Sequence, residues 1–415
     1  MLISPAFFSS PGGEPPVLVA GGGPAGMHAA LSLAGMGVPV LLAERSAHLG
    51  GQVMRLDKVY PTDHCAFCPV WTTAKACYES PLVRVLLRAS VEGLRTDGEQ
   101  AFADITVTPG WIDPQKCLFC GACAGACPSG ALHERDMTMT WDPALPPSMR
   151  IDESACTRCG KCAEACPAGA VQIGAEPVRL SVPVRDAVYA TGFEEPAPGT
   201  PAHAPEFGGG SHPDIFTAME FEAWHQESRG QDMLRRRSDS APVRRVAFIQ
   251  CAGARDVKHL PYCAAVCCMH AMKQARWLKR RQPDLEIALF YTDLRAPGAG
   301  QEAYVRAGIA EGIRPVRSRP GLVAASEARG GIAVRYDDPE TGSAVGEIFD
   351  IAVVNGGLGQ CPLPSGKGLP AAEGAAPAAC GFCAEPADVA GSAVQGSSAA
   401  ARVFLRLSGA QGGNA

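Results

Sequence analysis

Residues 17–44 read VLVAGGGPAGMHAALSLAGMGVPVLLAE, and this stretch decides the fold of the first part of the chain. Its pattern predicts a short buried strand over 17–20, a helix of small residues over 28–36 and a second apolar strand over 38–43. The turn between the first strand and the helix is G-x-G-x-x-G, and Glu44 ends the second strand. Strand, glycine turn, helix, strand and acid in this order are typical of a dinucleotide-binding unit.

Each glycine of the turn has a separate physical task in such a unit. Gly21 permits the tight turn, Gly23 lets the backbone approach a pyrophosphate, and Gly26 allows the helix to pack closely on the strand. The helix N-terminus then offers free N–H groups and a positive dipole end to the phosphates. Glu44 stands where an acid accepts a hydrogen bond from a ribose hydroxyl. The alternative, a glycine-rich turn without a ligand, leaves the surrounding strands and the acid unexplained.

Composition narrows the class of protein around this unit. The chain has 415 residues, enough for two or three domains, with 47% hydrophobic and 19% charged residues. A net charge of -5 argues against a nucleic-acid binder, which needs a basic excess. Residues 17–43 carry no charge, but their six glycines and two prolines exclude a membrane-spanning helix.

Cysteine is the outlier in this composition, with 18 residues in a long chain. Residues 1–16 lack a basic segment followed by an apolar one, so we expect no signal peptide. Closely and regularly spaced cysteines without an export signal indicate metal binding in a reducing compartment, and we expect a cytoplasmic protein.

Two cysteine runs share the pattern C-x2-C-x2-C-x3-C-P, which is the ferredoxin run for a pair of [4Fe–4S] clusters. In such runs the fourth cysteine crosses to the neighbouring cluster. A zinc site is the alternative, and two complete runs with both prolines argue against it. The predicted ligands are Cys117, Cys120, Cys123 and Cys166 for one cluster, and Cys156, Cys159, Cys162 and Cys127 for the other. We expect this insert over about 113–174, with a proline-rich connection over 142–147.

A second nucleotide-like domain is predicted to start with the strand RRVAFIQ at 244–250, but no glycine fingerprint follows it. Cys251 stands at the tip of this strand instead. A helix is expected over 262–281, with Cys263 and Cys267 on one face and Cys268 beside them. The four sulfurs then meet where a pyrophosphate would otherwise lie, which predicts a third [4Fe–4S] cluster. Buried free cysteines are the alternative.

Two further elements resemble the flavoprotein family related to thioredoxin and glutathione reductases. They are Gly50-Gly51 and the segment VYATG at 188–192. In that family both elements border FAD, so the resemblance implies FAD, rather than NAD, as the dinucleotide. It also implies Gly50, Gly51, Thr191 and Gly192 as cofactor contacts.

A more specific resemblance, over most of the chain, is to the A-type subunit of heterodisulfide reductase and its relatives. It rests on LGGQVMRLDKVYPTDHCAFC after the second strand, IQCAGARDVKHLPYCAAVCCMHAMKQA around the four cysteines, and CAEPADVAGSAVQGSSAAA near the C-terminus. The resemblance implies that the unusual cluster lies beside the flavin, that Lys273 faces the isoalloxazine as the candidate catalytic residue, and that Ser392 binds the cofactor. Without the family, Lys273 is typical of a solvated helix position. The extra N-terminal cluster domain and C-terminal ferredoxin domain of the larger members are expected to be missing here, and 355–379 looks abbreviated.

These observations predict an α/β protein: a thioredoxin-reductase-like flavoprotein of two dinucleotide domains with an inserted α+β two-cluster ferredoxin module. The expected cofactors are FAD and three [4Fe–4S] clusters. The expected boundaries are 1–112 and 177–240 for the first two parts of the FAD domain, 113–176 for the ferredoxin module, 241–351 for the NAD-domain-like part with the unusual cluster, and 352–415 for the last part of the FAD domain.

Six cysteines fall outside these sets. Cys65 and Cys68 form a C-x-x-C that the family also has, with Cys77 nearby, and a redox disulfide, a partial metal site and packing all stay open for them. Cys380 and Cys383 are expected to be structural, and Cys361 gives no signal.

The predicted function is an oxidoreductase subunit that transfers electrons between FAD and iron–sulfur clusters. The resemblance implies flavin-based bifurcation between ferredoxin and a disulfide-reducing partner, with B and C subunits and an electron-input module as partners. Nucleic acid and transmembrane segments are not expected. One alternative, a pyridine-nucleotide disulfide reductase working alone, is disfavoured by the lost second fingerprint, so we expect no activity with NAD(P)H alone. The other is a non-bifurcating adaptor in a quinone-linked or aromatic-acyl-CoA reductase complex.

Overall fold

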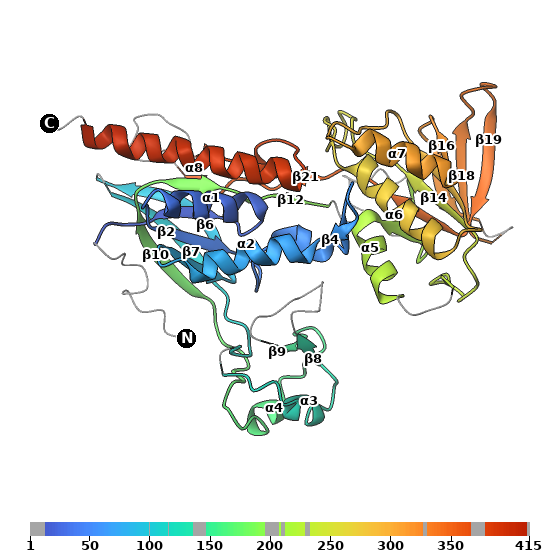
Figure 1. The fold of residues 1–415 in the computed structure, drawn as a ribbon. Helices are drawn as coiled ribbons and strands as arrows, with labels where there is room; N and C mark the ends of the chain where they lie inside the picture. Colours follow the sequence, from blue (N-terminus) through green and yellow to red (C-terminus); the bar gives the residue numbers. More distant parts are fainter. Residues whose placement is uncertain are drawn as a thin grey trace.

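A computed structural model describes residues 13–98, 100–114, 116–135, 147–195, 207–208, 212–228, 233–326, 330–366 and 378–412. Figure 1 shows two sheet-containing halves side by side and a small third part that extends away from the first half. The fold is α/β, with two sheet-containing halves and a small inserted part, as predicted. The predicted connection over 142–147 lies outside the described residues apart from residue 147, and so does part of 355–379.

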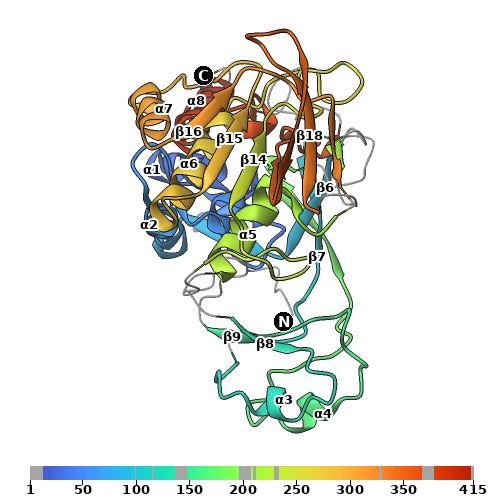
Figure 2. The ribbon, with the colours of Figure 1, turned by 90° about the vertical axis from the view of Figure 1, so that its right-hand side faces the viewer.

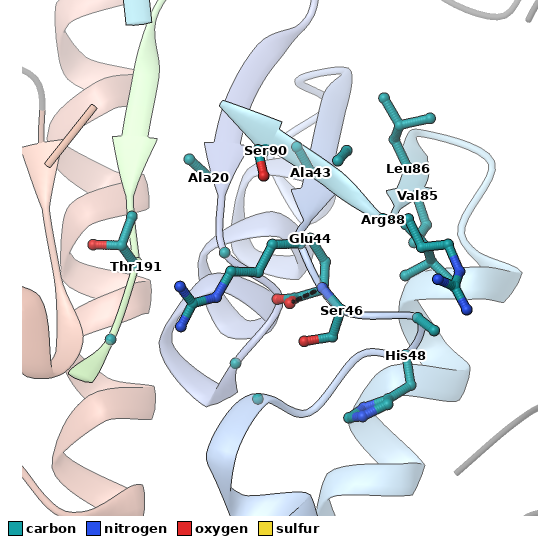
Figure 3. Close-up of a pocket in the computed structure, with 18 of the residues that line it drawn as sticks. Ala20, Ala43, Glu44, Ser46, His48, Val85, Leu86, Arg88, Ser90 and Thr191 are labelled. Atoms are coloured by element: carbon teal, nitrogen blue, oxygen red, sulfur yellow. Dashed lines mark hydrogen bonds between the residues drawn. The ribbon is translucent and has the colours of Figure 1, made fainter. Parts of the chain in front are cut away.

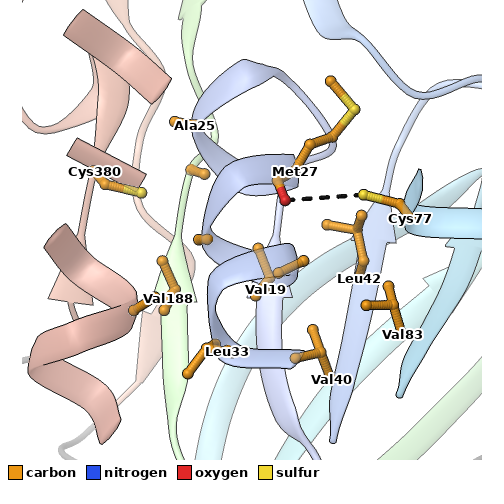
Figure 4. Close-up of a cluster of buried hydrophobic side chains, with 14 of the residues drawn as sticks. Val19, Ala25, Met27, Leu33, Val40, Leu42, Cys77, Val83, Val188 and Cys380 are labelled. Atoms are coloured by element: carbon orange, nitrogen blue, oxygen red, sulfur yellow. Dashed lines mark hydrogen bonds between the residues drawn. The ribbon is translucent and has the colours of Figure 1, made fainter. Parts of the chain in front are cut away.

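The first half is built on a parallel five-stranded sheet whose core is almost wholly aliphatic. The neighbouring strands β1 and β2 are buried along their whole length, as expected for a sheet covered on both faces. Val19, Leu42 and Val188 pack against Leu33 of the first helix, and Figure 4 shows this cluster. The strand order is β23 (Ala378–Ala379), β11 (Ala187–Tyr189), β1 (Val17–Ala20), β2 (Val40–Glu44) and β5 (Val83–Leu87).

Helices cover the first sheet, and a second, mainly antiparallel sheet packs beside it. The long helix α8 lies along α1 in Figure 1. The helices are α1 (Pro24–Gly35), α2 (Phe67–Glu79) and α8 (Val389–Gly412), with short 3-10 turns η2 (Gly51–Arg55) and η4 (Gly381–Cys383). The second sheet has the order β10 (Val178–Val184), β7 (Gln100–Val107), β6 (Ala89–Asp97) and β22 (Ser365–Gly366).

The small third part leaves this second sheet at the end of β7 and returns at the start of β10. Val107 and Val178 are paired in the antiparallel register, so the chain departs and returns at neighbouring points. A bridge between Ile112 and Val171 continues the closure, and Figure 2 shows the module hanging below both halves. The module contains α3 (Ala122–Gly125), β8 (Leu132–Arg135), β9 (Ser148–Ile151) and α4 (Lys161–Glu164).

The second half repeats the parallel α/β arrangement. Its sheet has the order β13 (Ile215–Thr217), β20 (Ile351–Val354), β14 (Arg245–Ile249), β15 (Glu286–Phe290) and β16 (Ile313–Val316). It carries α5 (Ala218–Glu227), α6 (Cys267–Arg281) and α7 (Gln301–Ala310). A three-stranded sheet of β17 (Leu322–Ala325), β18 (Ile332–Asp337) and β19 (Ala344–Phe349) packs on the other face.

Two small pairings complete the described fold. The strands β12 (Phe193–Glu194) and β21 (Gly359–Gln360) pair between the halves, and β3 (Lys58–Val59) pairs with β4 (His64–Cys65). Among the described residues, no helix is both long and apolar enough to cross a membrane.

Two sequence-based helix boundaries were wrong. The first helix begins at Pro24 rather than residue 28, because Gly23 is its N-cap and proline is well suited to the first turn. The helix expected over 262–281 begins only at Cys267, because Ala265 adopts a left-handed conformation with φ 62° that breaks the preceding turn. Cys263 therefore lies in a loop and does not share a helix face with Cys267.

Candidate flavin groove and thiolate sites

The glycine turn after β1 leaves the N-terminus of α1 open. Gly23 is the N-cap with φ -74°, no side chain caps the helix, and a Cβ on Gly23 would meet nothing within 4 Å. Gly21 has φ 111°, and a Cβ there would collide with the carbonyl of Ala190 on the neighbouring strand. A Cβ on Gly26 would overlap the carbonyl oxygen of Gly21. Gly21 and Gly26 thus hold helix and strand together, while Gly23 keeps open the approach for a phosphate.

Glu44 closes the turn from the end of β2. Its carboxylate accepts hydrogen bonds from the backbone N–H of Gly22 at 2.6 Å and of Ser46 at 2.7 Å, and the residue is 5% exposed. Figure 3 shows Glu44 among the residues that line the cavity, with its hydrogen bond to Ser46 dashed. These two bonds fix the carboxylate's orientation, so that a ribose placed over the turn meets an oriented acceptor.

A groove of about 2320 Å³ opens over this turn. Most of the residues predicted to bind the cofactor line it: Gly21, Gly23, Glu44, Gly51, Thr191, Gly192 and Ser392. The hydroxyl oxygen of Thr191 is buried and has no hydrogen-bond partner among the described residues. An open helix N-terminus, an oriented acid and an unpartnered hydroxyl together fit a dinucleotide.

Two of the predicted cofactor residues do not line the groove. Gly26 serves packing, as its contact with Gly21 shows. Gly50 has φ 112°, and a Cβ there would crowd Met54 and Val70 at the start of the 3-10 turn. Both glycines therefore shape the backbone around the groove rather than its surface.

The far wall of the groove belongs to the inserted module. Trp111, Met149 and Ile151 line it together with the dinucleotide turn. Met149 also donates its backbone N–H to the sulfur of Cys117 at 3.4 Å. One strand of the module, β9, thus contacts a predicted cluster ligand and the groove at the same time.

The cysteine runs of the module come together in the crossed arrangement. A small cavity is lined by Cys117, Cys120, Cys123 and Cys166, which mixes three residues of the first run with the last of the second. Burial raises the pKa of Cys123, and charges on Cys117 and Cys166 add to this effect. Ala170 donates its N–H to Cys166 at 3.3 Å, a contact that would stabilise a bound thiolate.

The second group of the module mirrors the first. Burial raises the pKa of Cys162, with further contributions from Cys156 of its own run and Cys127 of the other. Arg158, at φ 55°, donates its N–H to Cys156 at 3.4 Å. The structure thus brings together the predicted ligands of the first cluster, and Cys127, Cys156 and Cys162 of the second. The position of Cys159 as a ligand and the clusters themselves stay predictions.

The four cysteines of the second half also converge, although not from one helix. Cys251 follows β14 with φ 60°, Cys267 and Cys268 open α6, and Cys263 reaches the group from the loop. Burial raises the pKa of Cys267 well above its ordinary value, and negative charge on Cys268, Cys251 and Cys263 raises it further. Cys268 is buried and the other three are half-buried, and the charges of Cys251, Cys263 and Cys268 all act on Cys267. Such thiolates are unfavourable next to one another without a cation, so a positively charged metal group fits the site.

Over the part of the chain that the structure describes, no three His, Cys, Asp or Glu side chains stand close enough to hold a single metal ion. A tetrahedral zinc site with Zn–S bonds of about 2.3 Å brings its sulfurs within about 4 Å of one another. An iron–sulfur cube binds each thiolate to a different iron, so its sulfurs stand farther apart.

Lys273 is buried rather than solvated. The residue is 1% exposed, and its ammonium donates to the carbonyl of Lys58 and to Glu222, both at 2.9 Å. The ammonium also lies 4.6 Å from the centre of the Trp277 ring. Lys273 is not among the residues that line the groove, so the predicted contact with the isoalloxazine has no direct counterpart in the groove wall.

Glu222, which sequence reasoning missed, is the centre of this buried group. It is 0% exposed and accepts hydrogen bonds from the backbone of Asp57, from Gln274 and from Lys273. Burial alone would raise its pKa, but the charge of Lys273 and the contact with His270 hold the pKa well below its ordinary range. The sequence offered one signal for this site, a glutamate flanked by Phe221 and Trp224 in a predicted helix. A carboxylate buried beside aromatic rings needs a charged or hydrogen-bonding partner, so such a pattern indicates a buried ion pair.

A further carboxylate, half-buried, lies at the start of α5. Glu195 accepts a hydrogen bond from the hydroxyl of Thr217 at 2.7 Å at the start of α5. Burial raises its pKa to about 7, although Thr217 and the N–H of Met219 lower it. The sequence carries no signal for this placement.

The remaining cysteines separate into core and surface. Cys77 packs in the first core and donates to the carbonyl of Met27, as Figure 4 shows, and burial raises its pKa to about 12. Of the redox, metal-binding and packing roles left open by the sequence, Cys77 therefore has the packing role. Cys361, Cys380 and Cys383 are buried too, whereas Cys65 and Cys68 are exposed.

Comparison with known proteins assigns three segments to families. Residues 16–68 match the model described as FAD dependent oxidoreductase. Residues 116–170 and 148–195 match two models described as 4Fe-4S dicluster domain. These matches show an FAD-type segment and an iron–sulfur segment in one chain.

Curated relatives cover most of this chain. It is 32% identical, over 94% of its length, to an iron–sulfur A-type subunit of the CoB--CoM heterodisulfide reductase of Methanopyrus kandleri. It is 33% identical, over 82% of its length, to the A-type subunit of the H(2)/formate:CoB-CoM heterodisulfide,ferredoxin reductase of Methanococcus maripaludis. The chain covers 64% and 53% of these two relatives, so it spans between about half and two thirds of their length.

Among solved structures, thioredoxin reductase of Lactococcus lactis resembles this chain in fold over most of its length, as predicted. The TM-score is 0.51 at 14% identity, covering 94% of this chain and 98% of the other. At this identity the likeness shows the fold alone.

Proposed function

Because the chain belongs to the family of heterodisulfide reductase A-type subunits over the part of those proteins that it spans, we propose that it is the FAD- and iron–sulfur-containing electron-transfer subunit of a related complex. The observation that carries this proposal is the shared groove. Its one wall is the dinucleotide turn with Gly23 and Glu44, and its other wall is strand β9 of the iron–sulfur module.

FAD bound in this groove would supply the exchange between two-electron and one-electron chemistry. The protein's own part is to hold the pyrophosphate on the open N-terminus of α1 and to orient the ribose through Glu44. The module then keeps its cysteines close to the groove. Only strand β9 lies between them, since Met149 of β9 contacts Cys117 and also lines the groove.

The loop after β14 in the second half supports electron input by a partner protein. The strand β14 is followed by Cys251 instead of a glycine turn, and the next helix begins only at Cys267. Along residues 250–267, all of which the structure describes, no helix N-terminus directly follows the strand to receive a nicotinamide pyrophosphate. We therefore propose that the chain does not react with NAD(P)H alone and that electrons enter through a partner protein.

We further propose that the complex bifurcates electrons between ferredoxin and a disulfide-reducing partner with B- and C-type subunits. The name of the relative from Methanococcus maripaludis includes both heterodisulfide and ferredoxin. The competing proposal, a non-bifurcating adaptor, shares the same groove and clusters and differs only in the number of acceptors.

The experiment uses the complex purified through this chain, its electron donor, ferredoxin and a heterodisulfide. Donor oxidation is measured with each acceptor alone and with both together. Bifurcation requires both acceptors at once, with one electron reaching each, so either acceptor alone should give almost no turnover. Full turnover with one acceptor alone would show the adaptor instead, and rapid bleaching of the isolated chain by NADH would overturn partner input.

A further inference from the structure

The C-x-x-C pair lies on a hairpin that joins the two halves of the molecule. We define the docking hairpin as residues 57–66, in which β3 and β4 pair with Lys58 opposite Cys65, and Ala66 donates its N–H to Asp57. The chain continues from it directly into α2, with Ala66 as the N-cap. Cys65 thus ends a strand, and Cys68 stands in the first turn of a 13-residue helix.

Contacts to the second half hold the docking hairpin in place. The carbonyl of Lys58 accepts from Lys273 of α6, and the carboxylate of Asp63 lies 2.7 Å from Arg280 of the same helix. The ring of Tyr60 packs on the core of the second half. The hairpin therefore rests on the helix that Cys267 and Cys268 open.

On its other side the pair is one helical turn from the flavin groove. Trp71 lines the groove and follows Cys68 by three residues in α2, which is about 4.5 Å along the helix axis. Both thiols are exposed, whereas the other four cysteines outside the predicted cluster sets are buried. Packing therefore does not explain Cys65 and Cys68.

The two thiols lie next to each other at the start of α2. Cys68 is hydrogen-bonded to Cys65, and this bond raises the pKa of Cys68. An exposed thiol pair in a C-x-x-C spacing, with its second cysteine in the first turn of a helix, is suited to thiol–disulfide exchange.

We propose that Cys65 and Cys68 are a redox-active dithiol that reduces a disulfide presented by another molecule. The Cys65 thiolate attacks one sulfur of the acceptor disulfide, which forms a mixed disulfide and releases one acceptor thiolate. Cys68 then loses its proton and attacks the Cys65 sulfur, which closes the Cys65–Cys68 disulfide and releases the second acceptor thiolate. Two electrons pass to the acceptor, and an external dithiol restores the pair by the reverse exchange.

The test uses the anaerobic holoprotein equilibrated in buffers of dithiothreitol and its oxidised form, followed by alkylation and peptide mass spectrometry. We expect Cys65 and Cys68 to pass together from two alkylated thiols to one disulfide-linked state, with a single midpoint. With a chromogenic aromatic disulfide as acceptor, the wild type should release two thiolates per pair. Cys68→Ser should release one and remain as a mixed disulfide, and Cys65→Ser should react at least tenfold more slowly.

Cys77→Ser, in the core of the same helix, is the matched control and should react like the wild type. Independent alkylation of Cys65 and Cys68 at every buffer ratio would overturn the proposal. So would a loss of iron in either serine variant, since it would make the pair a metal site.

A second observation, independent of the first, concerns two buried amides beside Cys251. Strands β14 and β20 pair in parallel with Ile249 opposite Val354, so the next residues, Gln250 and Asn355, are neighbours at the carboxyl edge of the sheet. Their side chains are 1% and 4% exposed. Three of their side-chain atoms have no hydrogen-bond partner among the described residues: Nε2 and Oε1 of Gln250 and Nδ2 of Asn355.

Both amides lie on the face of the sheet that α6 covers. Side chains alternate along a strand, and Phe248 and Val353, two residues before each amide, pack in the core that includes Met269 and Met272 of α6. Helix α6 begins with Cys267 and Cys268 at the same edge of the sheet as the two amides. Buried unpaired amides cost free energy unless a partner satisfies them.

The geometry points to Gln250 and Asn355 as N–H donors to the sulfurs of the cluster proposed on Cys251, Cys263, Cys267 and Cys268. This inference rests on the proposed third cluster. Hydrogen bonds to cluster sulfurs stabilise the reduced, more negative state, so the two amides would raise the reduction potential of this cluster.

The test is an EPR-monitored redox titration of Gln250→Met and Asn355→Leu, which remove the donors with little change of volume. We expect the third cluster to shift to lower potential while the other two clusters and the iron content stay fixed. Gln301→Met, a buried glutamine on α7, is the control. An unshifted potential with all irons present would overturn this inference alone, whereas a wild-type protein with only two clusters would also overturn the third cluster on which the inference rests.

Discussion

Removing the charge of Lys273 tests the electrostatics at the junction of the two halves. In Lys273→Met the apolar chain is kept, but Glu222 loses its charged partner while remaining 0% exposed. Breaking a buried ion pair on one side costs about 3–5 kcal/mol, because a charge stays buried without compensation. At about 2–4 °C per kcal/mol for a unit of this size, the melting temperature of the holoprotein should fall by about 6–20 °C.

The assay is thermal unfolding followed by circular dichroism under anaerobic conditions, with flavin and iron content measured before heating. Lys279→Met on the same helix is the matched control, since Lys279 is partly exposed and its ammonium donates to the carbonyl of Pro283. The double variant with Glu222→Gln should recover most of the loss, because no charge is then left buried. A fall of under about 2 °C in the single variant would refute the reasoning.

The same variants separate a structural lysine from one that acts on the flavin. A cation at the reactive edge of the flavin stabilises its anionic reduced forms, so its removal should lower the flavin potential. The contacts of Lys273 with Lys58 and Glu222 instead predict a loss of stability with little change in that potential. Lowered potential with unchanged stability would restore the role that the family resemblance implies.

Three further predictions follow from single sites. Gly23→Asp should empty the flavin site without unfolding the protein, since a side chain there meets open space, whereas Gly26→Ala should destabilise the fold itself; flavin absorbance and circular dichroism distinguish the two. The double variant Cys267→Ser with Cys268→Ser should lose about four of about twelve irons by colorimetric assay, and an unchanged count would assign these residues to packing. Glu195 has a pKa raised to about 7, above an unfolded value of about 4.3, so its contribution to stability is full below about pH 4 and is lost as the pH rises through about 7. Glu195→Gln should flatten the stability profile over this range, and an unchanged slope would argue against a buried carboxyl.

Local patterns were enough to predict the parts of the molecule that depend on spacing. Residues 17–44 form the strand, turn and helix that their glycines require, and the two cysteine runs meet in the crossed order. In each case the chemistry lies within a short segment, so the backbone geometry follows from neighbouring residues. The helix start at Cys267 was missed because the left-handed turn at Ala265 has no signature in residue type.

The buried charges were not predictable in this way. Lys273 finds Glu222 across 51 residues and the carbonyl of Lys58 across 215, so its environment exists only after the two halves have packed. A lysine in a polar helix segment carries the same local pattern whether it is solvated or buried. The groove wall formed by Met149 depends likewise on how the module folds back on the first half.

The position of the insert explains how a module with its own thiolate groups can be tolerated inside a nucleotide-binding half. Val107 and Val178 are paired neighbours on antiparallel strands, so the insert replaces what would otherwise be a hairpin turn, and its length adds little to the entropy of closing the loop. The bridge between Ile112 and Val171 extends the ladder beyond the sheet and fixes the direction in which the module leaves. Because β9 then returns to the groove, the module stays at one end of the molecule and still borders the site where the flavin is proposed to bind. Strands β7 and β10 thereby place the module at the surface, where a partner can dock, and also close to the proposed flavin site.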